Sequence, residues 1–333
     1  MQHELAAIDV THMRGLEIGP LASPRVRKDQ GAVWYLDHAS AAELKQKYSP
    51  DPTMQGRLDE IVELDYVITE KSTIWEVVAE DAPFDYVIAA HVIEHIPDPI
   101  GWMADLTHVL RPGGILSLVI PDKRYCFDIN RSLTEISDLV DANLRQLRQP
   151  SYRQAFDFHS KAICGTVDTA AVWAGTADYS LAVRQDYDDP EAAALNLCRM
   201  METSDEFLDL HCHVFTPESF LSLIEKLARL DLIDYEVADF FPTELNAFEF
   251  FVSLRLLDAS AGGDSLSSKQ LASLARFRDG EGHPATTTGA KPPGVNKGVT
   301  RLENMEVSPL EKRVLDFKRN NLERIRAMLR RGR

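Results

Sequence analysis

Short apolar runs alternate with helix-like stretches along the first 122 residues of the chain. Each run has few polar positions, as expected of a strand that is covered on both faces. Between the runs, apolar residues recur at helical spacing; after Pro99 they occupy positions 100, 103, 106 and 110. The predicted strands cover residues 15–19, 33–37, 60–68, 84–90 and 115–120. This alternation predicts an α/β domain built on a doubly wound, Rossmann-like parallel sheet.

The pattern changes after residue 122. Residues 123–210 mix aromatic and acidic residues with helix-forming segments, which predicts a mostly helical insertion that closes over the sheet as a substrate lid. Residues 216–230 then predict a capped helix, because Thr216 precedes a proline at the first helical position. Two further strands, at residues 232–240 and 248–256, complete a predicted sheet of seven strands.

Composition divides the chain into three parts. Residues 1–258 are predicted to form one domain, and residues 259–304, with their runs of Gly, Ser, Thr and Pro, are predicted to form a flexible linker. Residues 305–333 hold nine Lys or Arg against four Asp or Glu and predict a basic amphipathic helix. A plain solvated helix is the favoured interpretation, and a docking helix or homodimer contact and peripheral contact with an anionic membrane surface are the alternatives.

Charge and cysteine content exclude several classes of protein. The net charge of −16 argues against a general nucleic-acid binder. The four cysteines are widely spaced, which indicates neither a zinc framework nor a disulfide scaffold. No apolar stretch approaches the ~18 residues of a membrane span, and the start of the chain lacks a signal-peptide pattern. We therefore expect a cytoplasmic protein.

The first predicted strand carries the first candidate chemistry. It ends at Gly19, where the backbone can approach a ligand because no Cβ intervenes. Glu17, two residues earlier, is placed to meet an ammonium group. The carboxyl ends of parallel strands, where such residues lie, form the binding crevice of open α/β sheets.

Five segments in order resemble class I S-adenosylmethionine-dependent methyltransferases. They are LEIGPLASP, VWYLDH, ELDY, FDYVIAAHVIEHIPDP and LRPGGILSLVIPD. The resemblance implies strand order 3-2-1-4-5-7-6 with strand 7 antiparallel, S-adenosylmethionine as cofactor, and methyl transfer to an oxygen or nitrogen of a small-molecule or sugar/glycan acceptor. The segments PDKRYCFD and HVFTPESF add a resemblance to bacterial methyltransferases associated with polysaccharide assembly.

The resemblance also assigns roles to individual residues. Glu17 would face the methionyl amine, Gly19 and the Pro20 turn would let the backbone meet the cofactor, and Asp37 would accept hydrogen bonds from both ribose hydroxyls. The remaining cofactor residues are His38 on the adenine face, Asp65 at the adenine amino group, Tyr66 stacking nearby and His91 along the methionyl part.

The first loop departs from the family pattern, since Leu21 and Ser23 stand where a second and third glycine are common. This departure motivates one alternative, a non-catalytic scaffold or binding protein with a methyltransferase-like fold. Another alternative, an NAD-dependent enzyme, fits less well because the loop lacks the G-x-G-x-x-G pattern.

Candidate residues for the acceptor are less specific. A hydroxyl acceptor would need a base, and the candidates by residue type are His91, His159, His211 and His213. Asp122, Lys123, Arg124 and Tyr125 follow strand five, where this fold places the transferred methyl group, and a surface ion-pair cluster is the competing interpretation.

No metal site is expected. The segment from His91 to His95 is not the H-E-x-x-H motif, and Glu94 and His95 are expected to be structural. A metal or general-base site built from His211, His213 and the Asp157–His159 region is conceivable, but polar residues that close the lid on the sheet are the favoured interpretation.

Overall fold

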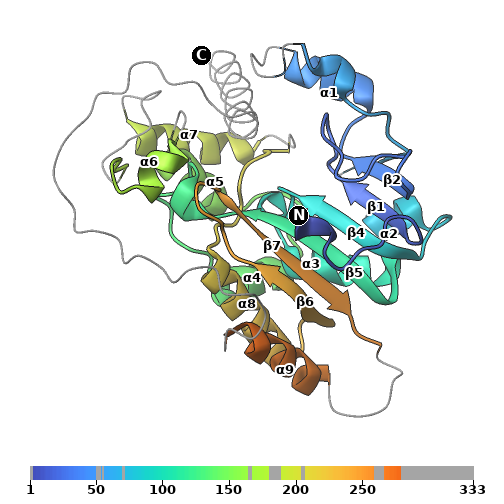
Figure 1. Ribbon diagram of the computed structural model, residues 1–333. Helices are drawn as coiled ribbons and strands as arrows, with labels where there is room; N and C mark the ends of the chain where they lie inside the picture. Colours follow the sequence, from blue (N-terminus) through green and yellow to red (C-terminus); the bar gives the residue numbers. More distant parts are fainter. Residues whose placement is uncertain are drawn as a thin grey trace.

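The computed structural model describes residues 3–49, 54, 56–69, 72–163, 167–179, 189–203, 207–258 and 266–278. Their centre is a seven-stranded sheet in the order β3-β2-β1-β4-β5-β7-β6 (Figure 1). The strands are β1 (Arg14–Ile18), β2 (Ala32–Asp37), β3 (Tyr66–Val67), β4 (Phe84–Ala90), β5 (Leu110–Pro121), β6 (Tyr235–Phe241) and β7 (Glu249–Leu256). Strand β7 pairs antiparallel with β5 and β6, whereas β1 to β5 pair in parallel. The expected strand order and the antiparallel last strand are confirmed.

Capping residues set where several helices begin. Ser40 and Thr73 each form a capping box with the glutamate three residues on, at the starts of α1 and α2. The α-helices are α1 (Ala41–Tyr48), α2 (Ile74–Val78), α3 (Pro99–Val109), α4 (Ile136–Leu144), α5 (Tyr152–Lys161), α6 (Thr169–Trp173), α7 (Pro190–Met201), α8 (Pro217–Arg229) and α9 (Leu266–Arg278). Four 3₁₀ turns cover His3–Leu5, Leu58–Glu60, Ile93–His95 and Lys123–Tyr125. None of the described helices is long and apolar enough to cross a membrane.

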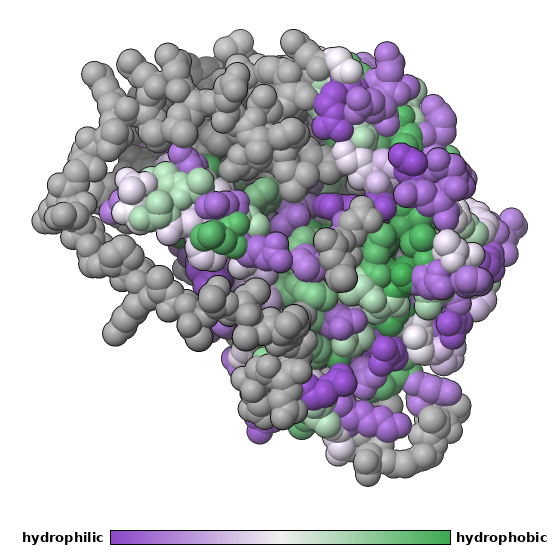
Figure 2. Space-filling model, viewed as in Figure 1, coloured by the Kyte–Doolittle hydropathy of each residue, from purple (hydrophilic) through white to green (hydrophobic). Residues whose placement is uncertain are grey.

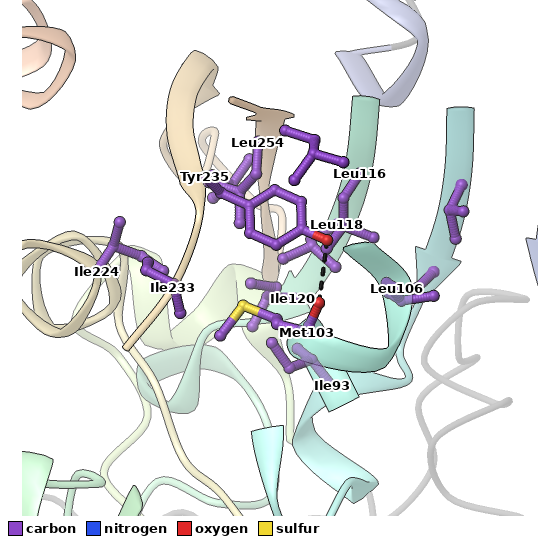
Figure 3. Close-up of a cluster of buried hydrophobic side chains, with 14 of the residues drawn as sticks. Ile93, Met103, Leu106, Leu116, Leu118, Ile120, Ile224, Ile233, Tyr235 and Leu254 are labelled. Carbon is purple, nitrogen blue, oxygen red and sulfur yellow. Dashed lines mark hydrogen bonds between the residues drawn. The ribbon is translucent and has the colours of Figure 1, made fainter. Parts of the chain in front are cut away.

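The main core lies between one face of the sheet and a layer of helices. Side chains from α2, α3, α4, α8 and α9 pack there against alternate residues of β4, β5 and β7. Figure 3 shows the ring of Tyr235 among Leu116, Leu118 and Leu254, and its hydroxyl donates to the carbonyl oxygen of Met103 at 3.1 Å. This bond pairs the one polar atom of a fully buried ring, as burial requires.

The opposite face of the sheet is covered by the N-terminal segment. Apolar residues of positions 5–13 pack on Tyr35, Tyr86 and Ile88. The connection from β1 to β2, residues 19–31, contains no helix. On this face, Figure 2 shows apolar residues over the strands at the centre and hydrophilic residues over the region of α1. Helices cover one side of the doubly wound sheet more completely than the other.

The region after β5 is helical, as expected, and contains α4 to α7. Figure 1 shows α5, α6 and α7 grouped at one end of the molecule, away from α9. Cluster contacts among Phe127, Ala155, Phe158 and Leu197 give this insertion its own small core. Helices α5 to α7 therefore pack apart from the main core, whereas α4 packs in it.

Two expectations about secondary structure were wrong. The third strand is two residues long rather than nine, because residues 58–60 form a 3₁₀ turn and residues 61–65 run irregularly to β3. Helix α9 lies inside the predicted linker, and it packs on β6 and α8 with Gln270, Ser273 and Leu274 buried. The other linker residues and the helix predicted at 305–333 lie outside the described residues.

Candidate active site

A cavity of about 670 Å³ opens at the carboxyl ends of β1, β2 and β4. The strand ends contribute Gly19, Asp37 and His91, and the insertion contributes residues such as Phe127, together with His211 directly after it. This is the crevice where open α/β sheets bind ligands, beside the point at which the strand order reverses between β1 and β4. A volume of this size is typical of a small-molecule or cofactor site.

Gly19 shapes the floor of the cavity. It has φ +70°, a backbone conformation that residues with a Cβ rarely adopt, and its N–H donates to the carbonyl oxygen of Leu36 at 2.9 Å. Leu21 in the same loop also has a positive φ, +45°. Pro20 is buried between them but is not among the cavity-lining residues. The loop turns sharply without the additional glycines that are common in the family.

Glu17 has an anchoring role in this geometry. Its carboxylate, 2% exposed, accepts the backbone N–H groups of Arg25 at 2.7 Å and Val26 at 3.1 Å. These bonds tie the long β1–β2 connection back to β1. Glu17 also lines the cavity, and the expectation that it faces a ligand amine stays a prediction. Its carboxylate has a structural role in addition.

Arg25 is a cavity residue that the sequence analysis missed. One guanidinium nitrogen, Nη1, binds Glu4 at 3.1 Å. The other, Nη2, is buried and has no hydrogen-bond partner among the described residues. A buried donor of this kind is costly unless a ligand satisfies it. The only sequence signal was an arginine close after the glycine turn, which is too common to single out.

Asp37 ends β2 at the cavity and is 7% exposed. Its Oδ1 accepts from the backbone N–H of His38 at 2.7 Å and lies 2.6 Å from His38 Nδ1. His38 also lines the cavity, and its Nε2 lies 2.9 Å from Lys47 Nζ. Both residues line the cavity, and their expected contacts with the ribose and the adenine stay predictions.

Asp65 and Tyr66 do not line the cavity. Asp65 precedes β3, where Oδ2 accepts the N–H of Tyr35 and Oδ1 binds Lys28. The hydroxyl of Tyr66 is paired with Asp81. Their expected adenine roles are not supported, because the short β3 places its carboxyl end beyond them. The residues that do line the cavity there are Ile68, Thr69, Ser72, Thr73 and Ile74.

His91 lies on the cavity wall directly after β4, with φ +55°. Its Nε2 is 2.7 Å from Glu249, and its Nδ1 is 3.4 Å from Glu94. Burial alone would lower its pKa, but the hydrogen bond to Glu249 and the nearby Glu94 carboxylate raise the pKa to about 9. The ring is thus an imidazolium at neutral pH, which does not fit the expected role of a general base.

His211 is the second candidate histidine that lines the cavity and contacts a carboxylate. Its Nδ1 lies 2.6 Å from Asp128, and Arg131 binds the other oxygen of Asp128 at 2.9 Å. Burial lowers the pKa of His211 although Asp128 opposes the shift, so the ring is held neutral. The Asp128 contact fixes the orientation of the ring and turns Nε2 away from Asp128.

The other two histidines lie outside the cavity lining. His159 is buried inside the insertion beside Phe158. His213 is 1% exposed, lies 3.3 Å from the carbonyl oxygen of Pro97, and has a pKa lowered to about 4, mainly by burial. The geometry supports a structural role for both.

Residues 122–125 also lie outside the cavity lining. Asp122, fully buried, binds the guanidinium of Arg124 and the hydroxyl of Thr243. Tyr125 stacks on Trp173, with ring centroids 4.2 Å apart. This segment joins β5 to the insertion, which favours the ion-pair interpretation over the substrate role expected of Asp122, Lys123, Arg124 and Tyr125.

His95 and the buried Glu94 lie at the end of the cavity that faces the insertion. His95 lines it, and its Nδ1 lies 3.0 Å from Asp209, which also binds Lys47 at 3.1 Å. Glu94 is fully buried directly behind, 4.0 Å from His211 Nε2. The network links α1, the turn after β4 and the insertion around one end of the cavity.

The sequence matches a known family over somewhat less than half of the chain. Residues 3–160 match the family model described as a methyltransferase domain. No curated protein matches the chain.

Several solved structures are similar to the chain at low identity. The CurJ carbon methyltransferase is 15% identical, with 75% of this chain and 50% of that chain covered and a TM-score of 0.35; this chain spans half of its length. A SAM-dependent methyltransferase from Methanosarcina mazei is 18% identical, with 75% and 94% covered and a TM-score of 0.36. The CcbJ methyltransferase from Streptomyces caelestis is 11% identical, with 76% and 92% covered and a TM-score of 0.37. At these scores the likenesses do not bear on the acceptor.

Proposed function

We propose, from the premise that this chain is a class I S-adenosylmethionine-dependent methyltransferase, that it methylates an oxygen of a small molecule held between the sheet and the insertion. The observation that carries the proposal is the single cavity of about 670 Å³ that joins Gly19 and Asp37 to His95 and His211. A donor half and an acceptor half therefore share one continuous space.

The donor half suits S-adenosylmethionine. Asp37, at the carboxyl end of β2, offers a buried carboxylate to a ribose diol, and a carboxylate can accept from two hydroxyls at once. Arg25 Nη2 offers a buried, unsatisfied donor that suits the carboxylate of the methionyl group. The cofactor supplies an electrophilic methyl group on a sulfonium centre, so the protein's main task is alignment.

Glu17 is proposed to act through the loop rather than through the ligand alone. By holding the backbone N–H groups of Arg25 and Val26, it fixes the position from which the Arg25 side chain enters the cavity. Gly19 keeps the floor of the cavity free of a side chain. These residues keep the donor half preformed.

The acceptor half is built by the insertion. Phe127, Phe207 and Leu147 supply apolar wall, and His95, Asp209 and His211 supply a polar end. An apolar wall with a few converging polar groups is typical of a site for a small molecule. A compact acceptor with one hydroxyl directed at the histidines fits this space better than an extended glycan chain, and a sugar remains within the size range.

The test is calorimetric titration with S-adenosylmethionine, S-adenosylhomocysteine and NAD, followed by transfer of labelled methyl groups to a panel of phenols, hydroxy acids and sugars. We expect micromolar binding of the first two ligands, none of NAD, and labelling of hydroxyl compounds. Binding without transfer to any acceptor would favour a scaffold, and absence of binding would overturn the proposal.

A further inference from the structure

We propose that Glu94, His95 and His211 form a binding site for one divalent transition-metal ion at the acceptor end of the cavity. One ligand atom from each residue lies within 4.8 Å of the other two. Two of the residues line the cavity, and the third is buried directly behind them. The ligands come from the turn after β4 and from the far end of the insertion, so the site would join the two layers.

Glu94 is the first observation that points to a ligand. Its side chain is 0% exposed, and neither carboxylate oxygen has a hydrogen-bond partner among the described residues. The His91 Nδ1 atom lies 3.4 Å from its Oε1, and the His211 Nε2 atom lies 4.0 Å from the same oxygen. A buried carboxylate without hydrogen bonds is expensive, and a coordinated cation would satisfy it.

The orientation of both imidazoles is the second, independent observation. His95 Nδ1 lies 3.0 Å from Asp209, and His211 Nδ1 lies 2.6 Å from Asp128. Histidines that bind metal through one nitrogen commonly hold a carboxylate on the other, which fixes the ring and strengthens it as a ligand. The His211 ring has this arrangement through its hydrogen bond with Asp128, whereas the contact of His95 with Asp209 is an ion pair without hydrogen-bond geometry. In both rings the carboxylate lies on the Nδ1 side, so Nε2 lies on the opposite side of the ring.

The two orienting carboxylates have cations of their own. Lys47 binds Asp209 at 3.1 Å, and Arg131 binds Asp128 at 2.9 Å. Among the three carboxylates of the cluster, Glu94 is therefore the one whose charge is least well neutralised by a cation. The His91 imidazolium and a metal ion would compete to neutralise the Glu94 carboxylate. Metal binding would therefore replace the ion pair between Glu94 and His91.

Two imidazoles and one carboxylate are a donor set suited to zinc, iron(II) and related first-row ions, and such three-ligand sites keep coordination positions open. His95 and His211 also line the cavity, so an ion held by them would be accessible to a ligand bound there. The ligand that this site would take is the oxygen of a hydroxyl or phenol acceptor; this step rests on the proposed function, whereas metal binding itself does not. His211 would then orient the acceptor as a metal ligand.

The experiment uses the full chain, freed of metal with a chelator and titrated with Co²⁺ and Zn²⁺. We expect one Co²⁺ per chain with visible absorption bands, displaced by Zn²⁺. Loss of a carboxylate that orients a metal ligand weakens metal affinity roughly 10–100-fold, and we expect Asp209→Asn to weaken Zn²⁺ binding within this range. Glu94→Gln and His211→Ala each remove a ligand itself and should weaken Zn²⁺ binding by more.

The matched control is His108→Ala, which removes an exposed histidine of α3 away from the cavity and should leave metal affinity unchanged. Circular dichroism and thermal melting establish that each variant folds. Absence of metal binding by the wild-type protein, or equal binding by Glu94→Gln, would overturn the inference.

Titration with S-adenosylmethionine on the same samples separates this inference from the proposed function. Cofactor binding without metal binding would remove the metal site and leave the methyltransferase proposal in place. Metal binding without cofactor binding would support the metal site and overturn the methyltransferase proposal.

Discussion

Replacement of Arg25 by methionine tests the donor half of the cavity most directly. The side chain is 17% exposed, Nη1 binds Glu4 at 3.1 Å, and Nη2 is the buried donor that has no protein partner among the described residues. Methionine keeps most of the apolar stem and removes every donor. If Nη2 holds the cofactor's carboxylate, the variant loses one charge-assisted hydrogen bond.

The size of the effect follows from the kind of bond. A hydrogen bond to a charged group contributes about 1.5–3 kcal/mol, which corresponds to a Kd for S-adenosylmethionine that is roughly 10- to 150-fold weaker. The same change leaves the buried Glu4 carboxylate without its arginine, so unfolding free energy should fall by about 1–3 kcal/mol as well. Binding must therefore be measured at a temperature where both proteins are folded.

The assay is calorimetry with S-adenosylmethionine and with its decarboxylated analogue, which lacks only the group assigned to Arg25. We expect Arg25→Met to weaken the binding of S-adenosylmethionine strongly and to leave the binding of the decarboxylated analogue almost unchanged. Arg27→Met is the matched control, because Arg27 is 64% exposed and pairs with Asp29, and it should change neither affinity. An equal loss for both ligands would show that Arg25 shapes the loop rather than contacts the carboxylate.

Three further changes test the site and the fold. Asp37→Asn should weaken S-adenosylmethionine and its decarboxylated analogue alike by at least about tenfold, since both contain the ribose; calorimetry in which either affinity is unchanged would count against the ribose role. Gly15→Ala would place its Cβ 1.9 Å from ring atoms of Tyr86, and we expect a loss of about 1–3 kcal/mol or more in denaturant unfolding, whereas an unchanged midpoint would show that the ring moves aside. Tyr235→Phe removes the buried hydroxyl bonded to Met103 and should cost about 0.5–1.5 kcal/mol in the same assay with cofactor affinity preserved; a loss of cofactor affinity would contradict its purely structural role.

Much of the sheet side of the cavity could be predicted from the sequence. Continuous apolar runs identify β1, β2 and β4 because strands covered on both faces need apolar residues at nearly every position. The positions of Asp37 and Gly19 in the cavity could be predicted from these strands, because residues at the carboxyl ends of parallel strands meet at one edge of the sheet. The prediction of the third strand was wrong, because a strand of two residues is too short to show a hydrophobic pattern.

Helix α9 shows a second limit. Its surroundings are rich in glycine and small polar residues, which predicted a linker, yet Leu274 and Gln270 are buried where the helix packs on β6. Most of the stability of a helix of this length comes from the surface that it covers rather than from its own propensity. That surface is not visible in the local sequence.

The sequence by itself determined which residue types were available for chemistry, and only the tertiary structure decided which of them meet. It supplied four candidate histidines without ranking them. The fold turns His91 into an imidazolium between two glutamates, buries His213 beside Pro97, and brings His211 to Glu94, which is 117 positions earlier in the chain. Periodicity reports what a residue's neighbours along the chain require, whereas a site depends on contacts between distant segments, which form only when the insertion packs against the sheet.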